Sequence, residues 1–238
     1  MRAALHPCYI LHLRPYRETS LIAEVFSRDY GRVGLVAKGA RRSRQRSVHQ
    51  PLRRLNIAWV MRGELGTLTQ IEAAGAVPVL NGRGLIAALY LNELVMRLLH
   101  RHESHPELFD AYDGALTAMS SAGDDEAILR VFEKRLLVSL GYGIVLDHDV
   151  STGAPVQNEL QYYYVTQKGP CIEADPSPGT IRISGETLTA LAQEKFTQRG
   201  QLTEAKRLMR LVLSEHLGLK PLASREIYRQ FLRHRQRA

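Results

Sequence analysis

Residues 20–37 have the sequence SLIAEVFSRDYGRVGLVA, in which apolar side chains recur at every second position on both sides of a turn. The alternation covers residues 21–25, is interrupted at residues 29–31, and resumes over residues 33–37. A period of two is typical of a strand that buries one face, and the Asp-Tyr-Gly segment is a turn signal. This stretch therefore predicts two antiparallel strands.

The same alternation continues on both sides of this stretch. It is present over residues 9–13 before the stretch and over residues 55–61 after it, and a turn at residues 62–64 leads into a fifth segment that ends at Ile71. Five short strands within about 75 residues favour a small closed barrel of the OB-fold type. An SH3-like barrel is the alternative that the pattern leaves open.

The apolar period changes to that of an α-helix after Leu85. Helices are predicted over residues 85–99, 106–119 and 124–140, and three more follow residue 183, with Ser184 and Ser224 as N-caps and Gly218 as a helix end. We predict an α+β protein: an OB-fold barrel (1–80), an α-helical domain (81–142 and 183–238), and an irregular insert (143–182). The insert is rich in glycine and proline and holds one hairpin around residues 162–165.

The composition excludes several classes of protein. The chain has 238 residues, of which 45% are hydrophobic and 24% charged, so a buried core is available. The longest uninterrupted apolar run, residues 85–91, is far shorter than the roughly 18 residues that cross a bilayer. Two cysteines form no disulfide framework. We therefore expect a cytoplasmic, nucleoid-associated protein without a membrane partner.

The positive charge is concentrated at the start of the chain. Residues 1–80 contain 13 basic and 5 acidic side chains, whereas the remainder contains 19 of each. Residues 38–54 contain no acidic residue, and such a stretch is either a solvated loop or a surface that binds a polyanion. We expect contacts with a nucleic-acid backbone from the basic side chains of this stretch: Lys38, Arg41, Arg42, Arg44, Arg46, Arg53 and Arg54.

Two aromatic residues are candidates for stacking on exposed bases, Tyr30 and Trp59. The alternation of Trp59 with Ile57 and Met61 favours a core position for its indole. Tyr30 therefore joins the predicted DNA-binding residues, and for Trp59 both interpretations stay open.

The residues of known catalytic and metal sites are not found in a convincing arrangement. Glycines 82 and 84 lack the other features of a phosphate-binding loop, and His100, His102 and His105 do not converge on one helix face. Asp147-His148-Asp149 is better explained as a loop, because neighbours in sequence usually point apart. We therefore predict a non-enzymatic binding protein with no cofactor, no catalytic residue and no metal site.

Several segments resemble one known family. LRVFEKRLL at residues 129–137, followed by LGY at residues 140–142, resembles the helix signature of the bacterial recombination mediator RecO. Further similarity to that family lies in the barrel and at both ends of the helical part: residues 14–21, 31–33, 36–41, 90–94, 220–222, 224–226 and 229–231. The resemblance spans nearly the whole chain.

The resemblance implies a function and a set of partners. A RecO-like protein binds single- and double-stranded DNA and anneals complementary strands coated by single-stranded-DNA-binding protein (SSB). With RecR it promotes the loading of RecA. The acidic SSB tail would bind the helical domain, where Arg130 and Lys134 lie four positions apart and would present two positive charges together. The alternatives are an RNA-binding OB-fold module or an accessory domain of a nucleic-acid enzyme.

The insert departs from the pattern of many RecO relatives. Those relatives hold structural zinc with two Cys-x-x-Cys pairs, and the equivalent positions here are His148, Ser151, Cys171 and Ala174. At most two of these residues could bind zinc, whereas structural zinc sites need four protein ligands. The resemblance is therefore to the zinc-free members of the family.

Overall fold

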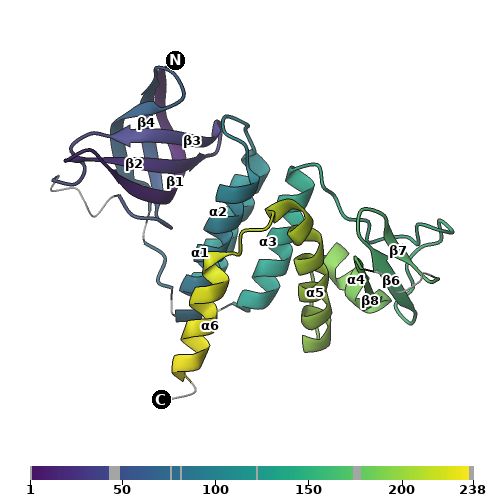
Figure 1. Ribbon diagram of the computed structural model, residues 1–238. Helices are drawn as coiled ribbons and strands as arrows, with labels where there is room; N and C mark the ends of the chain where they lie inside the picture. Colours follow the sequence, from purple (N-terminus) through teal and green to yellow (C-terminus); the bar gives the residue numbers. More distant parts are fainter. Residues whose placement is uncertain are drawn as a thin grey trace. The chain divides into compact units, whose positions relative to one another are not determined.

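The computed structural model describes residues 2–42, 49–75, 77–80, 82–121, 123–173 and 178–235. The chain divides into two compact units: unit 1 comprises Met1–Gly123 with Pro221–Ala238, and unit 2 comprises Asp124–Lys220. The predicted five-stranded barrel and the helical part are both confirmed, and Figure 1 shows the barrel and helices along the chain.

The barrel of unit 1 is closed by five strands in the order β1-β2-β3-β5-β4, which returns to β1. The strands are β1 (Arg2–Tyr16), β2 (Ser20–Ser27), β3 (Gly31–Ala37), β4 (Arg54–Met61) and β5 (Gly66–Ala73). All pairs are antiparallel except β3 with β5, which pair in parallel from Leu35 opposite Gly66. This arrangement, a five-stranded Greek-key barrel, is that of the predicted OB-fold.

The barrel interior contains the residues that the alternation predicts. Val25, Val33, Leu35 and Ile57 are fully buried there. Trp59 is 1% exposed in the same cluster, so the core interpretation of this residue is confirmed and the stacking interpretation is wrong. An indole in this position contributes to the apolar core and is not available to a base.

The outer face of β1 and β2 is also buried, which the alternation does not predict. The register between β1 and β2 shifts between Ile10 and His12, and such an irregularity changes the direction in which successive side chains point. Tyr9 and Phe26 lie outside the barrel interior, and their rings contact Phe109 and Tyr112 of a helix. Helix packing therefore covers one side of the barrel.

Three helices complete unit 1: α1 (Gly82–Leu98), α2 (Pro106–Ser120) and α6 (Ala223–Arg235). The turn before β3 fits closely against the segment between α1 and α2. A Cβ atom on Gly31, whose φ is +63°, would lie 1.7 Å from the carbonyl oxygen of Glu103, so only glycine fits.

The start of α6 is held by α1. The Glu93 carboxylate accepts hydrogen bonds from the backbone N–H groups of Ala223 at 2.8 Å and Ser224 at 2.9 Å. The Ser224 hydroxyl donates to the same carboxylate at 2.7 Å. Ser224 therefore lies inside α6, and its predicted role as the N-cap is wrong because the carboxylate from α1 satisfies the free N–H groups.

Unit 2 combines three helices with a small sheet: α3 (Asp125–Ser139), β6 (Gln161–Val165), β7 (Gly169–Cys171), β8 (Thr180–Ser184), α4 (Gly185–Ala192) and α5 (Arg199–Leu217). The predicted hairpin consists of β6 and β7, and β8 adds a third strand in the order β7-β6-β8. Ser184 caps α4 by accepting from the Thr187 N–H, and Gly218 ends α5 with a φ of +67°, as predicted. None of the described helices is long and apolar enough to span a membrane.

Candidate nucleic-acid interface

One end of the barrel brings together two basic turns that are separated in sequence. The Arg41 N–H donates to the carbonyl oxygen of Thr19 at 3.0 Å. The Arg41 guanidinium donates through Nη1 to the carbonyl oxygens of Glu18 at 2.9 Å and Arg17 at 3.2 Å. The turn after β3 is therefore fastened to the turn between β1 and β2.

Four basic side chains are exposed at these two turns: Arg17, Lys38, Arg41 and Arg42. We call this set the barrel-end cluster. Within the described ranges none of the four forms an ion pair, although Glu18 is an exposed acidic residue of the same turn. The Arg17 guanidinium carbon lies 5.1 Å from the centre of the Tyr16 ring. The net charge of the cluster is therefore available to a polyanion.

Sequence reasoning missed Arg17. This residue lies outside the acid-free stretch, and only the pairing of β1 with β2 and β3 with β2 brings its turn beside Lys38–Arg42. The predicted OB-fold could have indicated Arg17, because the loop between the first two strands contacts nucleic acid in OB-folds.

Not all predicted backbone contacts have the same surroundings. Arg44 and Arg46 lie outside the described residues. Arg53 is half-buried. Arg54, at the start of β4, donates through Nη1 to Asp113 of α2 at 2.9 Å, so an acidic partner within the protein already neutralises its charge.

Asp113 has a second donor in Tyr9. The Tyr9 hydroxyl donates to the other carboxylate oxygen of Asp113. Burial, helped by the hydrogen bond to Asp113, raises the pKa of Tyr9 far above its usual value, so the hydroxyl keeps its proton and remains a donor. The Arg54 contact is thus part of the attachment of the barrel to α2.

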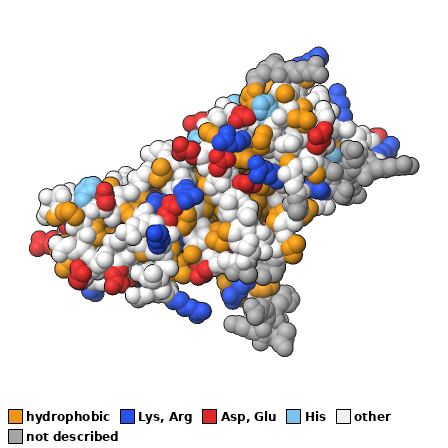
Figure 2. Space-filling view, turned by 180° about the vertical axis from the view of Figure 1, so that it is seen from behind, with side chains coloured by type: hydrophobic (Ala, Val, Ile, Leu, Met, Phe, Trp, Pro, Cys, Tyr) orange, Lys and Arg blue, Asp and Glu red, His pale blue; other side chains and the backbone are white. Residues whose placement is uncertain are grey.

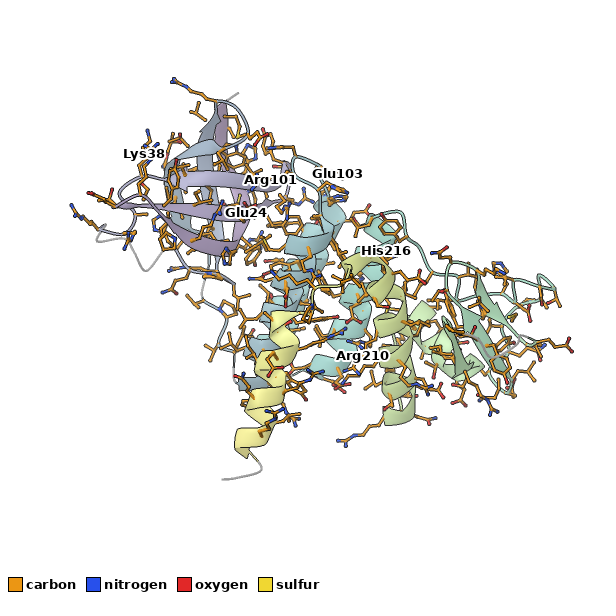
Figure 3. The ribbon with its side chains drawn as sticks, in the orientation of Figure 1. Glu24, Lys38, Arg101, Glu103, Arg210 and His216 are labelled. Carbon is orange, nitrogen blue, oxygen red and sulfur yellow. The ribbon has the colours of Figure 1, made fainter. Side chains whose placement is uncertain are left out.

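Other cations of unit 1 are also paired within that unit. Arg28 forms a two-pronged pair with Asp110 of α2, with nitrogen-to-oxygen distances of 3.0 and 2.8 Å. Arg101 pairs with Glu24, and Figure 3 shows these two residues on the barrel side nearer to α2 and Lys38 on the opposite side. On the face in Figure 2, basic side chains likewise lie among acidic ones.

Tyr30 is half-buried and does not stand free of the barrel. Its ring meets Trp59 edge-on at 5.2 Å between centroids and His6 edge-on at 4.8 Å. The His6 ring is in turn 2.7 Å from a carboxylate oxygen of Asp29. The role of Tyr30 as a stacking platform stays a prediction, and these contacts leave only part of its ring for a base.

Arg130 and Lys134 on α3 do not present two free charges together. Arg130 is 4% exposed and pairs at 2.7 Å with Glu133, which is 1% exposed. Lys134 pairs with Glu194 at 3.1 Å and donates to the carbonyl oxygen of Ala192 at 2.7 Å. The expectation of an exposed cationic pair is therefore wrong, because spacing along a helix does not show which face is buried. Binding of an acidic tail by these residues stays a prediction.

The comparisons with known proteins cover almost the whole chain. The family model described as "Recombination protein O N terminal" matches residues 1–77, and the model described as "Recombination protein O C terminal" matches residues 80–226. The chain belongs to the RecO family. The N-terminal RecO model thus covers the barrel that carries the barrel-end cluster, and the C-terminal RecO model covers most of the helical part.

Individual RecO proteins are similar over nearly their full length. The DNA repair protein RecO of Nitrosococcus oceani is 46% identical over 98% of this chain and 96% of that protein. The DNA repair protein RecO of Alkalilimnicola ehrlichii is 45% identical over 98% of this chain and 93% of its own. The DNA repair protein RecO of Vibrio cholerae is 42% identical over 97% of this chain and 95% of that protein.

In this RecO-family chain a carboxylate joins the segment that contains His148 and Ser151 to the residue that follows β7. Asp149, which is 1% exposed, accepts hydrogen bonds from the N–H and hydroxyl of Ser151 at 2.8 and 2.5 Å, and from the N–H of Ile172 at 2.9 Å. Cys171 is buried, and its thiol lies 3.5 Å from the carbonyl oxygen of Tyr163. Among described residues no three metal-binding side chains cluster, and Ala174 lies outside those residues.

Proposed function

We propose that this RecO-family protein is a non-enzymatic recombination mediator in DNA repair. It binds single- and double-stranded DNA, anneals complementary strands coated by SSB, and acts with RecR to promote RecA loading on SSB-coated single strands. The observation that supports the proposal most strongly is the barrel-end cluster, in which four exposed cations lie on one end of an OB-fold without an ion-pair partner among the described residues.

The chemistry of annealing fits such a surface. Two phosphate backbones repel each other, and exposed cations reduce that repulsion by contacting phosphates without reading bases. Lys38, Arg41 and Arg42 would make these contacts, with Arg17 beside them. Arg44, Arg46 and Arg53 extend the proposed surface by sequence, whereas Arg54 would first have to leave Asp113.

The proposed SSB contact concerns unit 2. A receptor for an acidic tail must offer positive charge, and Lys134 is the predicted residue that retains 18% side-chain exposure. Its exchange from Glu194 to a carboxylate of the tail would replace one ion pair by another, which costs little at a protein surface. Arg130 would support this surface from within through its pair with Glu133.

A strand-annealing assay on SSB-coated complementary oligonucleotides, without ATP or added metal, tests the proposal. The wild-type chain should accelerate annealing, and a variant with Lys38→Ala, Arg41→Ala and Arg42→Ala should lose most of that acceleration. A charge-matched control carries Lys168→Ala, Arg182→Ala and Lys195→Ala, three exposed positions of unit 2. Full activity of the barrel variant, or equal loss in both variants, would contradict the proposed site.

A further inference from the structure

Tyr142 occupies an unusual place at the end of α3. The helix ends in a Schellman motif, in which Gly141 has a φ of +78° and the Tyr142 N–H donates to the carbonyl oxygen of Leu137 at 2.8 Å. The residue at this position of the motif commonly packs an apolar side chain back on its own helix. The Tyr142 ring instead reaches another helix.

The Tyr142 ring stacks on His216 of α5. The two ring centroids are 4.0 Å apart, and the ring planes differ by 20°. Tyr142 is nevertheless 47% exposed. The ring pairs of the barrel, by contrast, are tilted or edge-on. The two rings are nearly parallel and one of them is half exposed, so a further planar ring can stack on the exposed one.

The end of α5 carries exposed cations as well as an acidic residue. Lys220 follows the end of α5 and is exposed, and Arg210, six positions before His216, is exposed on the same helix. Arg210 and Lys220 form no ion pair with any described acidic residue. Figure 3 labels Arg210 and His216 on α5, with His216 nearer to the end of the helix. Glu215 is the acidic neighbour, and its carboxylate accepts from Gln167 at 3.3 Å.

We propose that Tyr142, backed by His216, is a stacking platform for one unpaired base of a single-stranded nucleic acid. Every base has a π-face, so such a platform binds without sequence preference. This inference rests on the proposed DNA-binding function. It adds a second contact, in unit 2, to the barrel-end cluster of unit 1, so that one chain can hold nucleic acid at two places.

The test measures binding of an oligo(dT) strand and of an abasic oligomer of equal length and charge by the full chain. Tyr142→Ala should weaken oligo(dT) binding by about 5- to 150-fold, the loss of one base stack, and leave abasic binding unchanged. Tyr142→Phe should bind like wild type. Tyr142→Leu keeps an apolar side chain of similar length at this position but removes the π-face, so it should behave like Tyr142→Ala.

Salt dependence separates this inference from the proposed function. The loss in Tyr142→Ala should be the same at 50 and 200 mM salt, because stacking involves no net charge, whereas Lys38→Ala with Arg41→Ala and Arg42→Ala should lower the salt slope. If the wild type binds oligo(dT) and Tyr142→Leu binds equally well, the platform is wrong and the proposed function stands. If the wild type binds neither oligomer, the proposed function itself fails.

A peptide is the competing occupant. A labelled acidic peptide with an apolar carboxyl end provides the corresponding measurement. If Tyr142→Ala and Tyr142→Leu lose this peptide while keeping oligo(dT) affinity, the ring pair is a protein-docking surface and the inference is overturned. Unchanged peptide binding together with lost oligo(dT) binding supports it. Circular dichroism of each variant confirms that α3 and α5 remain folded.

Discussion

The barrel end and helix α3 both carry basic residues that the sequence marks as binding sites, but the structure treats them differently. At the barrel end, Lys38 and Arg42 are exposed without an ion-pair partner among the described residues. On α3, Arg130 is buried against Glu133 and Lys134 is tied to Glu194. A cation can serve a ligand only if no carboxylate of the same chain already holds it, so the two sets should respond differently to mutation.

The largest expected effect is on stability, at Arg130. Arg130→Ala breaks a 2.7 Å ion pair with Glu133 in which both side chains are buried, and breaking a buried pair typically costs about 3 to 5 kcal/mol. Urea unfolding followed by circular dichroism should show this loss in the free energy of unfolding. Arg42→Ala at the barrel end should change that free energy by less than about 0.5 kcal/mol. If the two variants had similar free energies of unfolding, the proposed difference between a buried, paired cation on α3 and an exposed cation at the barrel end would be wrong.

The next effect concerns DNA affinity. With about five phosphate contacts, wild-type affinity for a single strand should fall roughly 100-fold between 50 and 200 mM salt. The variant with Lys38→Ala, Arg41→Ala and Arg42→Ala should lower the slope of log affinity against log salt by about 2, since each contact contributes about 0.7. Fluorescence anisotropy over a salt series measures both values. A flat wild-type response would remove the barrel end from the proposed interface.

A smaller effect is expected at Glu93, whose carboxylate accepts hydrogen bonds from backbone N–H groups. Burial raises the pKa of Glu93, but the hydrogen bonds from Ser224 and Ala223 and the charge of Arg97 outweigh it, so the pKa lies below its usual value. A lowered pKa stabilises the folded state above the unfolded pKa, near 4.5, and this contribution is lost as the pH falls through the folded value.

Glu93→Gln should therefore cost about 1 to 2 kcal/mol at pH 7, because the amide replaces one acceptor oxygen and carries no charge. The difference between the variant and the wild type should shrink below about pH 4, as the wild-type carboxyl takes up its proton. Thermal unfolding at pH 7 and pH 3.5 measures this. A difference that stays constant with pH would mean that the charge of Glu93 contributes nothing.

The smallest effect is expected at Arg28, where both partners are largely solvated. The side chains of Arg28 and Asp110 are 40% and 56% exposed, and solvent screens such exposed pairs, so they contribute little to stability. Arg28→Gln should change the free energy of unfolding by less than Glu93→Gln does. It should also leave the salt slope of DNA binding unchanged, because Asp110 already neutralises Arg28. A reduced slope would show that neutralised cations exchange readily with phosphate.

Local periodicity predicted most of the architecture correctly. The alternation over residues 20–37 became β2 and β3, and the capping serine at position 184 begins α4. The errors have one kind of cause. Ser224 was expected to cap α6, but Glu93, 131 positions away, does so. The strand β8 was missed because it pairs with β6, which is not its neighbour along the chain.

The candidate site was predicted only in part, for a related reason. The acid-free stretch identified Lys38, Arg41 and Arg42, whereas Arg17 joins them only through the neighbouring turn. Trp59 is buried in the core, as its alternation with Ile57 and Met61 predicted. The Tyr142 and His216 pair has no signal in the sequence, because the two residues lie 74 positions apart and meet only where α3 and α5 end.

The amino-acid sequence by itself determined the barrel, the helices and the excess of positive charge at the start of the chain, because these depend on neighbours along the chain and on composition. Only the tertiary structure decided which cations remain available. Asp110, Asp113 and Glu24 neutralise Arg28, Arg54 and Arg101 across separations of 59 to 82 residues. Neutralisation requires contact in space, and contact between such distant residues follows from the packing of the helices on the barrel.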